Sequence, residues 1–159
     1  MAVLDLADLA SALAAGSAVL GLDLGEKRIG VAISDASRLI ASPLRPLRRT
    51  KFTDDAAHLF ELMAARGAGA LVIGLPVNMD GREGPRSQSA RAFARNLLRL
   101  RDLPIALWDE RLSTAAVERV LRDEADLSRK RRGALLDSAA AAWILQGALD
   151  WLRRHHSNL

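Results

Sequence analysis

The sequence contains no cysteine and no tyrosine, and aromatic residues make up only 4% of its 159 residues. The lack of cysteine excludes disulfides and thiolate metal sites, and it fits the reducing cytoplasm, where we expect the protein to act. So few aromatic rings argue against a surface that binds its ligand mainly by stacking. A large anionic partner would have to be held through charge instead.

Long apolar runs are missing as well. None approaches the roughly 20 residues that a membrane-spanning helix needs. The first residues, MAVLDLADLASALAAGS, are apolar but include Asp5 and Asp8 and no positively charged start, so they do not resemble a signal peptide. We therefore expect a soluble protein with no membrane partner.

The chain is long enough for one domain with a real core, since 50% of its residues are hydrophobic, and too short for two. We assign residues 18–154 to this domain, 1–17 to an N-terminal arm with a short amphipathic helix through Leu6, Leu9 and Leu13, and 155–159 to a C-terminal tail. Hydrophobic patterning predicts five strands, at Val19–Leu24, Arg28–Ser34, Leu39–Leu47, Ala70–Pro76 and Pro104–Glu110. It predicts four helices, at Thr53–Arg66, Ser87–Arg101, Ser113–Glu124 and Ala134–Arg154. Thr53 is the expected N-cap of the first of these helices. This order indicates an α/β fold with a mixed sheet covered by helices.

Positive charge is present in excess and is clustered: 23 Lys and Arg against 19 Asp and Glu give a net charge of +4. The clusters are Arg45–Lys51, Arg86–Arg101 and Arg129–Arg132. In the second, Arg91, Arg95 and Arg99 have the i, i+4, i+8 spacing of one helical face. Any one cluster is compatible with an ordinary solvated face. Three in one small domain favour a polyanion, such as a nucleic acid contacted through its backbone.

One carboxylate stands inside a predicted buried strand. In VLGLDLG (Val19–Gly25), Val19, Gly21, Asp23 and Gly25 share one face, and leucines occupy the other. A buried charge is unfavourable unless something pairs with it, and the glycines leave room for a ligand or substrate to approach. A turn-forming Asp at a strand end is the simpler alternative.

Two further stretches place acids at the edge of the predicted core. Asp109 and Glu110 follow a strand, and since consecutive residues face opposite ways, at most one should join Asp23. Both could also lie in a solvated loop. Asp137 begins the apolar stripe of the last helix, although helix capping could explain it. Three acids on three elements repel one another unless a cation binds, and carboxylate oxygens suit Mg²⁺ or Mn²⁺.

Four stretches resemble the YqgF/RuvX family of ribonuclease H-like proteins, described as pre-16S ribosomal RNA nucleases and as Holliday junction resolvases: GLDLGEKRIGVAISD, VIGLPVNMDGREG, WDERLSTAAVERVL and LLDSAAAAWILQ. The resemblance runs from about Val19 to Leu152. It implies a ribonuclease H-like fold, a central mixed β-sheet of about five strands flanked by α-helices. It also implies that Asp23, Glu110 and Asp137 are the catalytic, metal-binding acids, so it selects Glu110 over Asp109.

The reaction implied by this resemblance is phosphodiester hydrolysis assisted by two Mg²⁺ or Mn²⁺ ions about 4 Å apart. Asp35 and Asp109 are candidates for a fourth acid. Basic residues near the motifs would contact the phosphates of a ribosomal RNA precursor or of DNA: Arg82, Arg86, Arg91, Arg95, Arg111, Lys130, Arg131 and Arg132. Association with the ribosome would accompany the first substrate.

Three other interpretations stay open at this point. Resolution of a Holliday junction needs two active sites and hence a homodimer, whereas a monomer could mature RNA. A ribosomal RNA-binding factor without catalysis would keep the basic clusters but would not need the three acids together. GLDLG also resembles the phosphate-binding hairpin of actin-like ATPases, which need two such domains where this chain has length for one.

Overall fold

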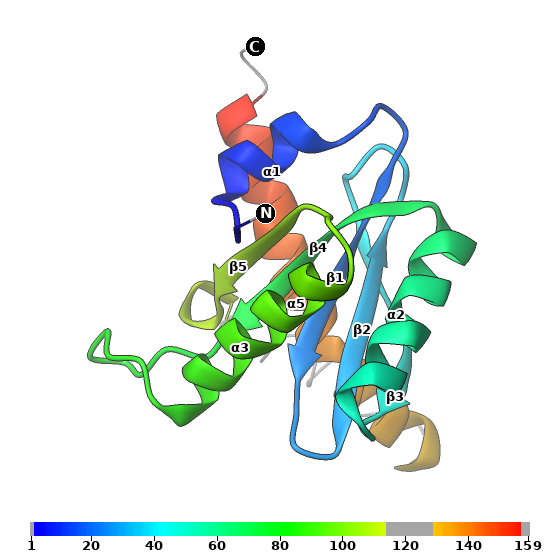
Figure 1. Cartoon of the computed structure of the whole chain (residues 1–159), viewed down its shortest axis with the longest axis vertical. Coiled ribbons are helices and arrows are strands. Elements are labelled where there is room, and N and C mark those ends of the chain that lie inside the picture. Colours follow the sequence, from blue (N-terminus) through cyan, green and yellow to red (C-terminus); the bar gives the residue numbers. More distant parts are fainter. Residues whose placement is uncertain (1, 114–128, 157–159) are drawn as a thin grey trace.

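The computed structural model describes residues 2–113 and 129–156, with the backbone alone for residues 113, 129–137 and 156. Five strands form one sheet in the order β3-β2-β1-β4-β5 (Figure 1). They are β1 (Ala18–Leu24), β2 (Arg28–Ser34), β3 (Ala41–Arg48), β4 (Ala68–Leu75) and β5 (Ile105–Asp109). The first three pair antiparallel, whereas β4 runs parallel to β1 and β5 parallel to β4. The predicted mixed sheet is confirmed.

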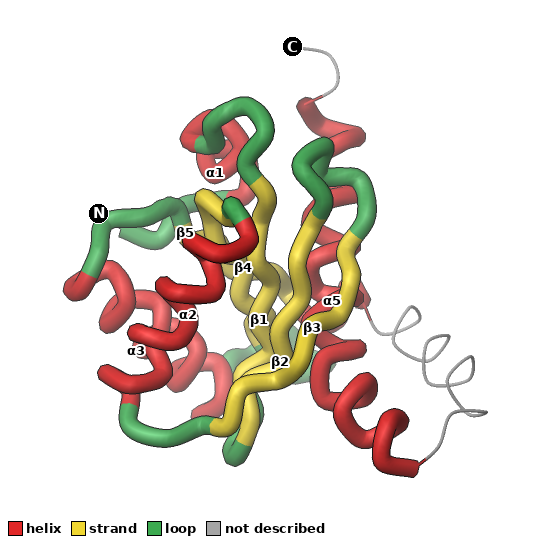
Figure 2. The backbone as a smooth tube through the Cα atoms, turned by 90° about the vertical axis from the view of Figure 1, so that its right-hand side faces the viewer, coloured by secondary structure: helices red, strands yellow, loops and turns green. Residues whose placement is uncertain are grey.

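Helices cover both faces of this sheet (Figure 2). One face carries α2 (Phe52–Arg66) and α3 (Pro85–Leu100), and the other carries α5 (Arg129–His156), against which α1 (Leu6–Ala12) packs. The strands supply the two layers alternately, since Leu20 and Leu22 pack with α2 and α3 while Val19 packs with α5. Among the described residues, no helix has the length and apolar character needed to cross a membrane.

The beginning of α2 differs from the prediction. Thr53 is not the N-cap, because the helix begins at Phe52 and Lys51 occupies the cap position without a side-chain hydrogen bond. The Asp55 carboxylate reaches back and accepts from the backbone N–H (3.0 Å) and the hydroxyl (2.8 Å) of Thr50. These hydrogen bonds tie the first turn of the helix to the residue that precedes its N-cap.

The segment after β5 is described only in part. Glu110 opens a 3-10 turn, η1 (Glu110–Ser113), and the helix expected at Ser113–Glu124 falls almost entirely outside the described ranges. The last helix, α5, extends beyond the predicted Ala134–Arg154 at both ends. Its length carries it across the sheet from one end to the other (Figure 1).

Candidate active site

Three parallel strands bring Asp23 and Glu110 to the same edge of the sheet. Asp23 is the next-to-last residue of β1, Glu110 directly follows β5, and β4 lies between these strands. Gly74 of β4 makes the approach possible: a Cβ atom there would lie 2.7 Å from Oε1 of Glu110. Because that atom is missing, the Glu110 side chain lies directly against β4 within interaction distance of Asp23.

The two carboxyl groups affect each other strongly. Burial and then the charge of Asp23 raise the pKa of Glu110 to about 7, and the positive charge of Arg86 opposes this shift. A hydrogen bond between the two carboxyl groups also favours the protonated form of Glu110. Without a cation, Glu110 therefore keeps its proton to higher pH than an ordinary glutamate. When a cation is bound, both carboxyl groups can ionise, which is the behaviour expected of ligands for a hard divalent ion.

The backbone of α5 passes close to this pair. Oγ of the fully buried Ser138 accepts a hydrogen bond from the Val31 N–H at 3.3 Å, and Val31 follows Gly30, the register partner of Asp23. Position 137 therefore lies near the level of Asp23. It also lies two helical turns before Ile144, which packs on Gly74, so it belongs to the sheet-facing side of the helix.

The third predicted acid, Asp137, is thus placed by its backbone. Its side chain belongs to the segment for which the structure describes main chain alone. Within the described side chains, no cluster of three or more acidic or histidine residues forms a metal site. Asp23 and Glu110 are the two predicted metal ligands that the described side chains bring together.

The glycines beside Asp23 do not leave room for a ligand, contrary to the expectation from the sequence. A Cβ atom at Gly21 would lie 2.7 Å from Cβ of Leu145, because α5 packs directly on that face. A Cβ atom at Gly25 would lie 2.7 Å from the carbonyl oxygen of Arg28, across the β1–β2 turn. The glycine that serves the acid pair is Gly74, which the sequence interpretation missed. Its signal was a glycine among the large apolar residues Leu71–Leu75.

The other two acids that the sequence offered are engaged elsewhere. Arg111 donates to Asp109 at 2.6 Å and lowers the pKa of that carboxyl. The Asp35 carboxylate accepts from the backbone N–H groups of Leu39 (2.8 Å) and Ile40 (3.0 Å), and these bonds lower its pKa. Since β2 runs antiparallel to β1, Asp35 lies at the opposite end of the sheet from Asp23. Asp35 is therefore not a fourth acid of this site.

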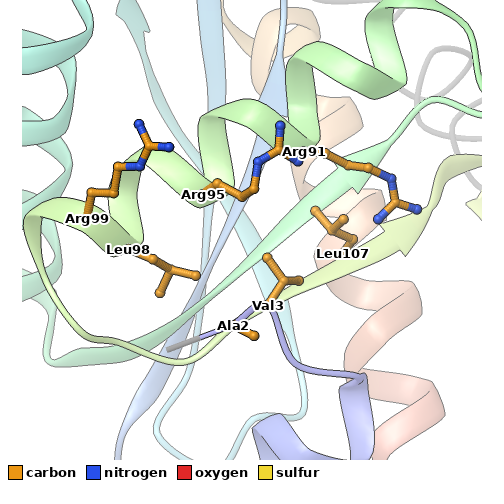
Figure 3. A pocket seen from close by; sticks show the side chains of 7 residues that line it. All are labelled: Ala2, Val3, Arg91, Arg95, Leu98, Arg99 and Leu107. Carbon is orange, nitrogen blue, oxygen red and sulfur yellow. The ribbon is translucent and has the colours of Figure 1, made fainter.

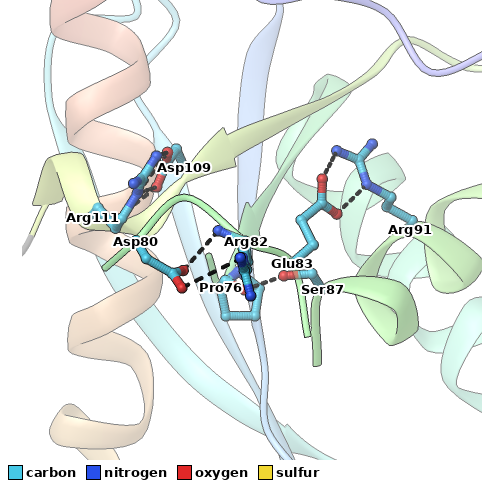
Figure 4. Close-up of polar contacts among 8 residues, drawn as sticks. All are labelled: Pro76, Asp80, Arg82, Glu83, Ser87, Arg91, Asp109 and Arg111. Carbon is cyan, nitrogen blue, oxygen red and sulfur yellow. Dashed lines mark hydrogen bonds and ion pairs between the residues drawn. The ribbon is translucent and has the colours of Figure 1, made fainter. Parts of the chain in front are cut away.

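A short hairpin loop between β4 and α3 lies beside Asp109 and Arg111 (Figure 4). A bridge pairs Val77 with Glu83, and the Asn78 N–H donates to the Arg82 carbonyl at 2.9 Å. The tip needs a glycine, because Gly81 has a φ of 88°. At its base, the Ser87 hydroxyl donates to the Pro76 carbonyl and ties the loop to the first turn of α3. These bonds give the loop a defined shape beside Arg111, the residue that follows Glu110.

The predicted phosphate-binding arginines differ in how they are partnered. Arg86, in the first turn of α3, acts electrostatically on Glu110, and Arg82 is 87% exposed, with Asp80 3.8 Å away. Two others form close ion pairs, Arg91 with Glu83 and Arg111 with Asp109, each at 2.6 Å (Figure 4). Arg95 lies one turn beyond Arg91, and Lys130, Arg131 and Arg132 lie where α5 is described by its backbone.

The strand order and the helices on both faces define a ribonuclease H-like fold. Solved structures share it. RuvC of Thermus thermophilus, in complex with a Holliday junction substrate, aligns with a TM-score of 0.53 at 15% identity, over 80% of this chain and 91% of RuvC. The yeast mitochondrial Holliday junction resolvase Ydc2 aligns with a TM-score of 0.53 at 16% identity, over 94% of this chain and 86% of Ydc2. At these identities the likeness concerns the fold alone.

Sequence comparison then gives the family. The family model described as "RuvX: Holliday junction resolvase" matches residues 17–151, so the chain belongs to the RuvX family, as the motifs predicted. A relative from Phenylobacterium zucineum (strain HLK1), named "Putative pre-16S rRNA nuclease", is 66% identical over 96% of this chain and 99% of its own length. A relative of the same name from Caulobacter vibrioides (strain NA1000 / CB15N) is 64% identical over 96% of this chain and 99% of its own length. Another, from Rhodospirillum rubrum, is 59% identical over 97% of this chain and 96% of its own length.

Proposed function

We propose that this chain is a metal-dependent nuclease that hydrolyses phosphodiester bonds in the 5′-end maturation of pre-16S ribosomal RNA. The observation that carries the proposal is the contact between the Asp23 and Glu110 carboxyl groups at the edge where β1, β4 and β5 end. A purely structural role explains this contact poorly, because two facing carboxyl groups oppose each other's ionisation. The names of relatives up to 66% identical supply the substrate.

The donor set fits Mg²⁺ or Mn²⁺. Asp23 and Glu110 present hard oxygen ligands, and Asp137 would complete the set from the sheet-facing side of α5. A bound divalent cation supplies Lewis-acid activation of the attacking water and of the phosphodiester. Glu110 is positioned for this role by the missing side chain of Gly74, and α5 is held at the level of Asp23 by Ser138.

Positive charge beside the acids would hold the substrate. Arg86 lies close enough to influence Glu110, and Arg82 projects from the adjacent hairpin into solvent. Both are suited to phosphate oxygens on either side of the cleaved bond. Arg111 would join them once it exchanges Asp109 for phosphate. The basic segment Lys130–Arg132 would contact the substrate backbone further away. Such a substrate places the protein in the cytoplasm, in association with the immature ribosome.

The test is cleavage of end-labelled precursor ribosomal RNA, single-stranded DNA and a four-way DNA junction, each with Mg²⁺, Mn²⁺ or EDTA. We expect wild-type protein to cut the precursor RNA in either metal and not in EDTA. Asp23→Asn and Glu110→Gln should each lower the rate by about 10²-fold or more, the effect of removing a preorganised charge at a reaction centre. Asp35→Asn is the matched control, a carboxylate at the other end of the sheet, and it should leave the rate unchanged.

Two other functions would give different results in the same assay. Preferred cutting of the four-way junction by a dimer would favour a Holliday junction resolvase, the activity in the description of the matching family model. Binding of the precursor RNA without cleavage in any metal would favour a non-catalytic ribosomal RNA-binding factor. Either result would contradict the proposal.

A further inference from the structure

A second candidate site lies outside the acid pair. A cavity of about 480 Å³ opens between α3, β5 and the N-terminal segment (Figure 3). One side consists of Arg91, Arg95 and Arg99, on successive turns of α3. Leu98 of α3, Leu107 of β5 and Val3 of the N-terminal segment form an apolar floor. This volume is in the range of small-molecule and nucleotide pockets, roughly 300–1,000 Å³.

The N-terminal segment is a fixed wall of this pocket. The Leu4 N–H donates to the Ile105 carbonyl at 2.8 Å, and Leu4 bridges Ala106 in parallel, so the segment runs alongside β5 like a short added strand. The next residues anchor it further, because Leu6 and Leu9 of α1 are buried in the core formed with α5. The pocket therefore does not depend on a loose end of the chain.

The arginines of the pocket are not equivalent. Arg91 donates two hydrogen bonds to Glu83, so its charge is largely matched. Arg95 and Arg99 are exposed, and neither forms an ion pair with a side chain that the structure describes. Two exposed guanidinium groups beside an apolar floor suit a ligand that combines negative charge with a flat, weakly polar group. A nucleotide unit of a nucleic acid has this chemistry.

Helix α3 connects the pocket to the acid pair. Its first turn carries Arg86 beside Glu110, and the rise of 1.5 Å per residue places Arg95 about 14 Å and Arg99 about 20 Å further along the axis. A strand following this helix could engage both places at once. An unpaired base could enter the cavity, whereas the bases of a duplex are stacked inside it. Guanidinium planes can also stack on bases, which compensates for the scarcity of aromatic rings in this chain.

We propose that this pocket holds one nucleotide of a single-stranded RNA whose cleaved phosphate lies at Asp23 and Glu110, with Arg95 and Arg99 on the adjoining phosphates and the base on the apolar floor. The inference rests on the proposed nuclease function. It gives the N-terminal segment a part in substrate binding and assigns Arg99 to the same site as Arg95.

The first test is binding of a fluorescent dodecamer RNA in EDTA. Arg95→Gln combined with Arg99→Gln should weaken binding about tenfold at low salt. It should also lower the slope of log K against log salt concentration by about 1.4, because each phosphate that an arginine neutralises contributes roughly 0.7 to that slope. The control, Arg153→Gln with Arg154→Gln near the end of α5, removes the same charge far from the cavity. Equal effects of the two pairs would overturn the proposal.

The second test locates the RNA. Since the chain has no cysteine, Val3→Cys carries the only thiol, and a photo-crosslinker attached there reports on the cavity alone. We expect a cross-link to the dodecamer that disappears when Arg95 and Arg99 are replaced by Gln. Ala36→Cys, in the exposed turn after β2, is the control and should give none. Absence of a cross-link at position 3 while the dodecamer is bound would overturn the proposal.

Cleavage separates this inference from the function on which it rests. With Mg²⁺, the Arg95→Gln, Arg99→Gln pair should lower kcat/KM on the dodecamer about tenfold and leave a dinucleotide, too short to reach the pocket, unaffected. Normal cleavage of both by this pair contradicts the pocket alone. If wild-type protein cuts neither substrate in any metal, the nuclease function is contradicted, while the binding and cross-linking results still decide whether the pocket takes RNA.

Discussion

The two ends of the sheet both carry carboxylates, but they use them in opposite ways. At one end, Asp35 accepts two backbone N–H groups from its own turn, and these bonds lower its pKa. At the other end, Glu110 faces Asp23, and burial together with that neighbour raises its pKa to about 7. A carboxylate that shapes a turn is satisfied by the chain itself. In the acid pair the two carboxyl groups oppose each other's ionisation, which is the behaviour expected of ligands for a divalent cation.

The largest loss of stability should come from Gly74→Ala, which tests whether the missing side chain at Gly74 is what allows Glu110 to approach Asp23. The new Cβ atom would lie 2.7 Å from Oε1 of Glu110 and would collide with Cδ1 of Ile144. We expect unfolding in urea to show a loss of about 1–3 kcal/mol, as for overpacked cores, and cleavage to fall at least tenfold. Gly84→Ala is the control: the nearest atom there is 3.8 Å away, so it should lose only up to about 1 kcal/mol, from a weaker N-cap of α3, and should leave cleavage close to wild type.

A compensating substitution separates packing from chemistry in that variant. Adding Ile144→Val to Gly74→Ala relieves the collision with α5 but leaves the one with Glu110. Stability should then recover and cleavage should not. Recovery of both would mean that Gly74 serves only the packing of α5.

Ser138→Ala should have the next largest effect. It removes the buried partner of the Val31 N–H, so the free energy of unfolding should fall by about 1–2 kcal/mol. Cleavage should fall as well, because the bond holds α5 at the level of Asp23. Ser11→Ala, on the exposed side of α1, removes a weaker bond within the helix and should change stability by less than about 0.5 kcal/mol. A loss of stability with unchanged cleavage would show that position 137 is not set by this hydrogen bond.

The pH dependence of stability should have opposite signs at the two ends. The pKa of Glu110 is raised in the folded protein, so the metal-free fold should lose stability as the pH rises from about 4.5 to about 7. Glu110→Gln should remove that loss. The pKa of Asp35 is lowered, so its contribution is present above pH 3.8 and is lost in more acidic solution. Urea unfolding in EDTA from acidic to neutral pH would measure the contributions of Glu110 and Asp35 to stability. If Glu110→Gln lost as much stability as wild type when the pH rises, the coupling of Glu110 with Asp23 would be contradicted.

The smallest effect should come from Asp109→Asn. Its ion pair with Arg111 is partly exposed, so the loss of stability should be below about 1 kcal/mol and smaller still in high salt. Cleavage should stay within a few-fold of wild type, in contrast to Glu110→Gln one position later. Equal losses of activity in the two variants would mean that the site does not distinguish the neighbouring acids.

Much of this arrangement could be predicted from local pattern. The alternation around Asp23 predicted its face of β1, and the four motifs predicted the family and the ribonuclease H-like sheet. The sequence could not give what depends on packing between distant elements. Gly21 appeared open because nothing local indicates that Leu145 fills the space. Asp35 appeared equivalent to Asp109 because only the antiparallel register places it at the far end. Gly74 and Ser138 matter through contacts with residues more than 30 positions away.

The central claim is that Asp23 and Glu110 form a site for a divalent cation, and crystals soaked in Mn²⁺ would test it most directly. Anomalous diffraction should place manganese within coordination distance of oxygens from both carboxyl groups, and Asp23→Asn should remove or weaken that peak. No manganese at this edge of the sheet in well-occupied crystals, or manganese at Asp35 instead, would contradict the account.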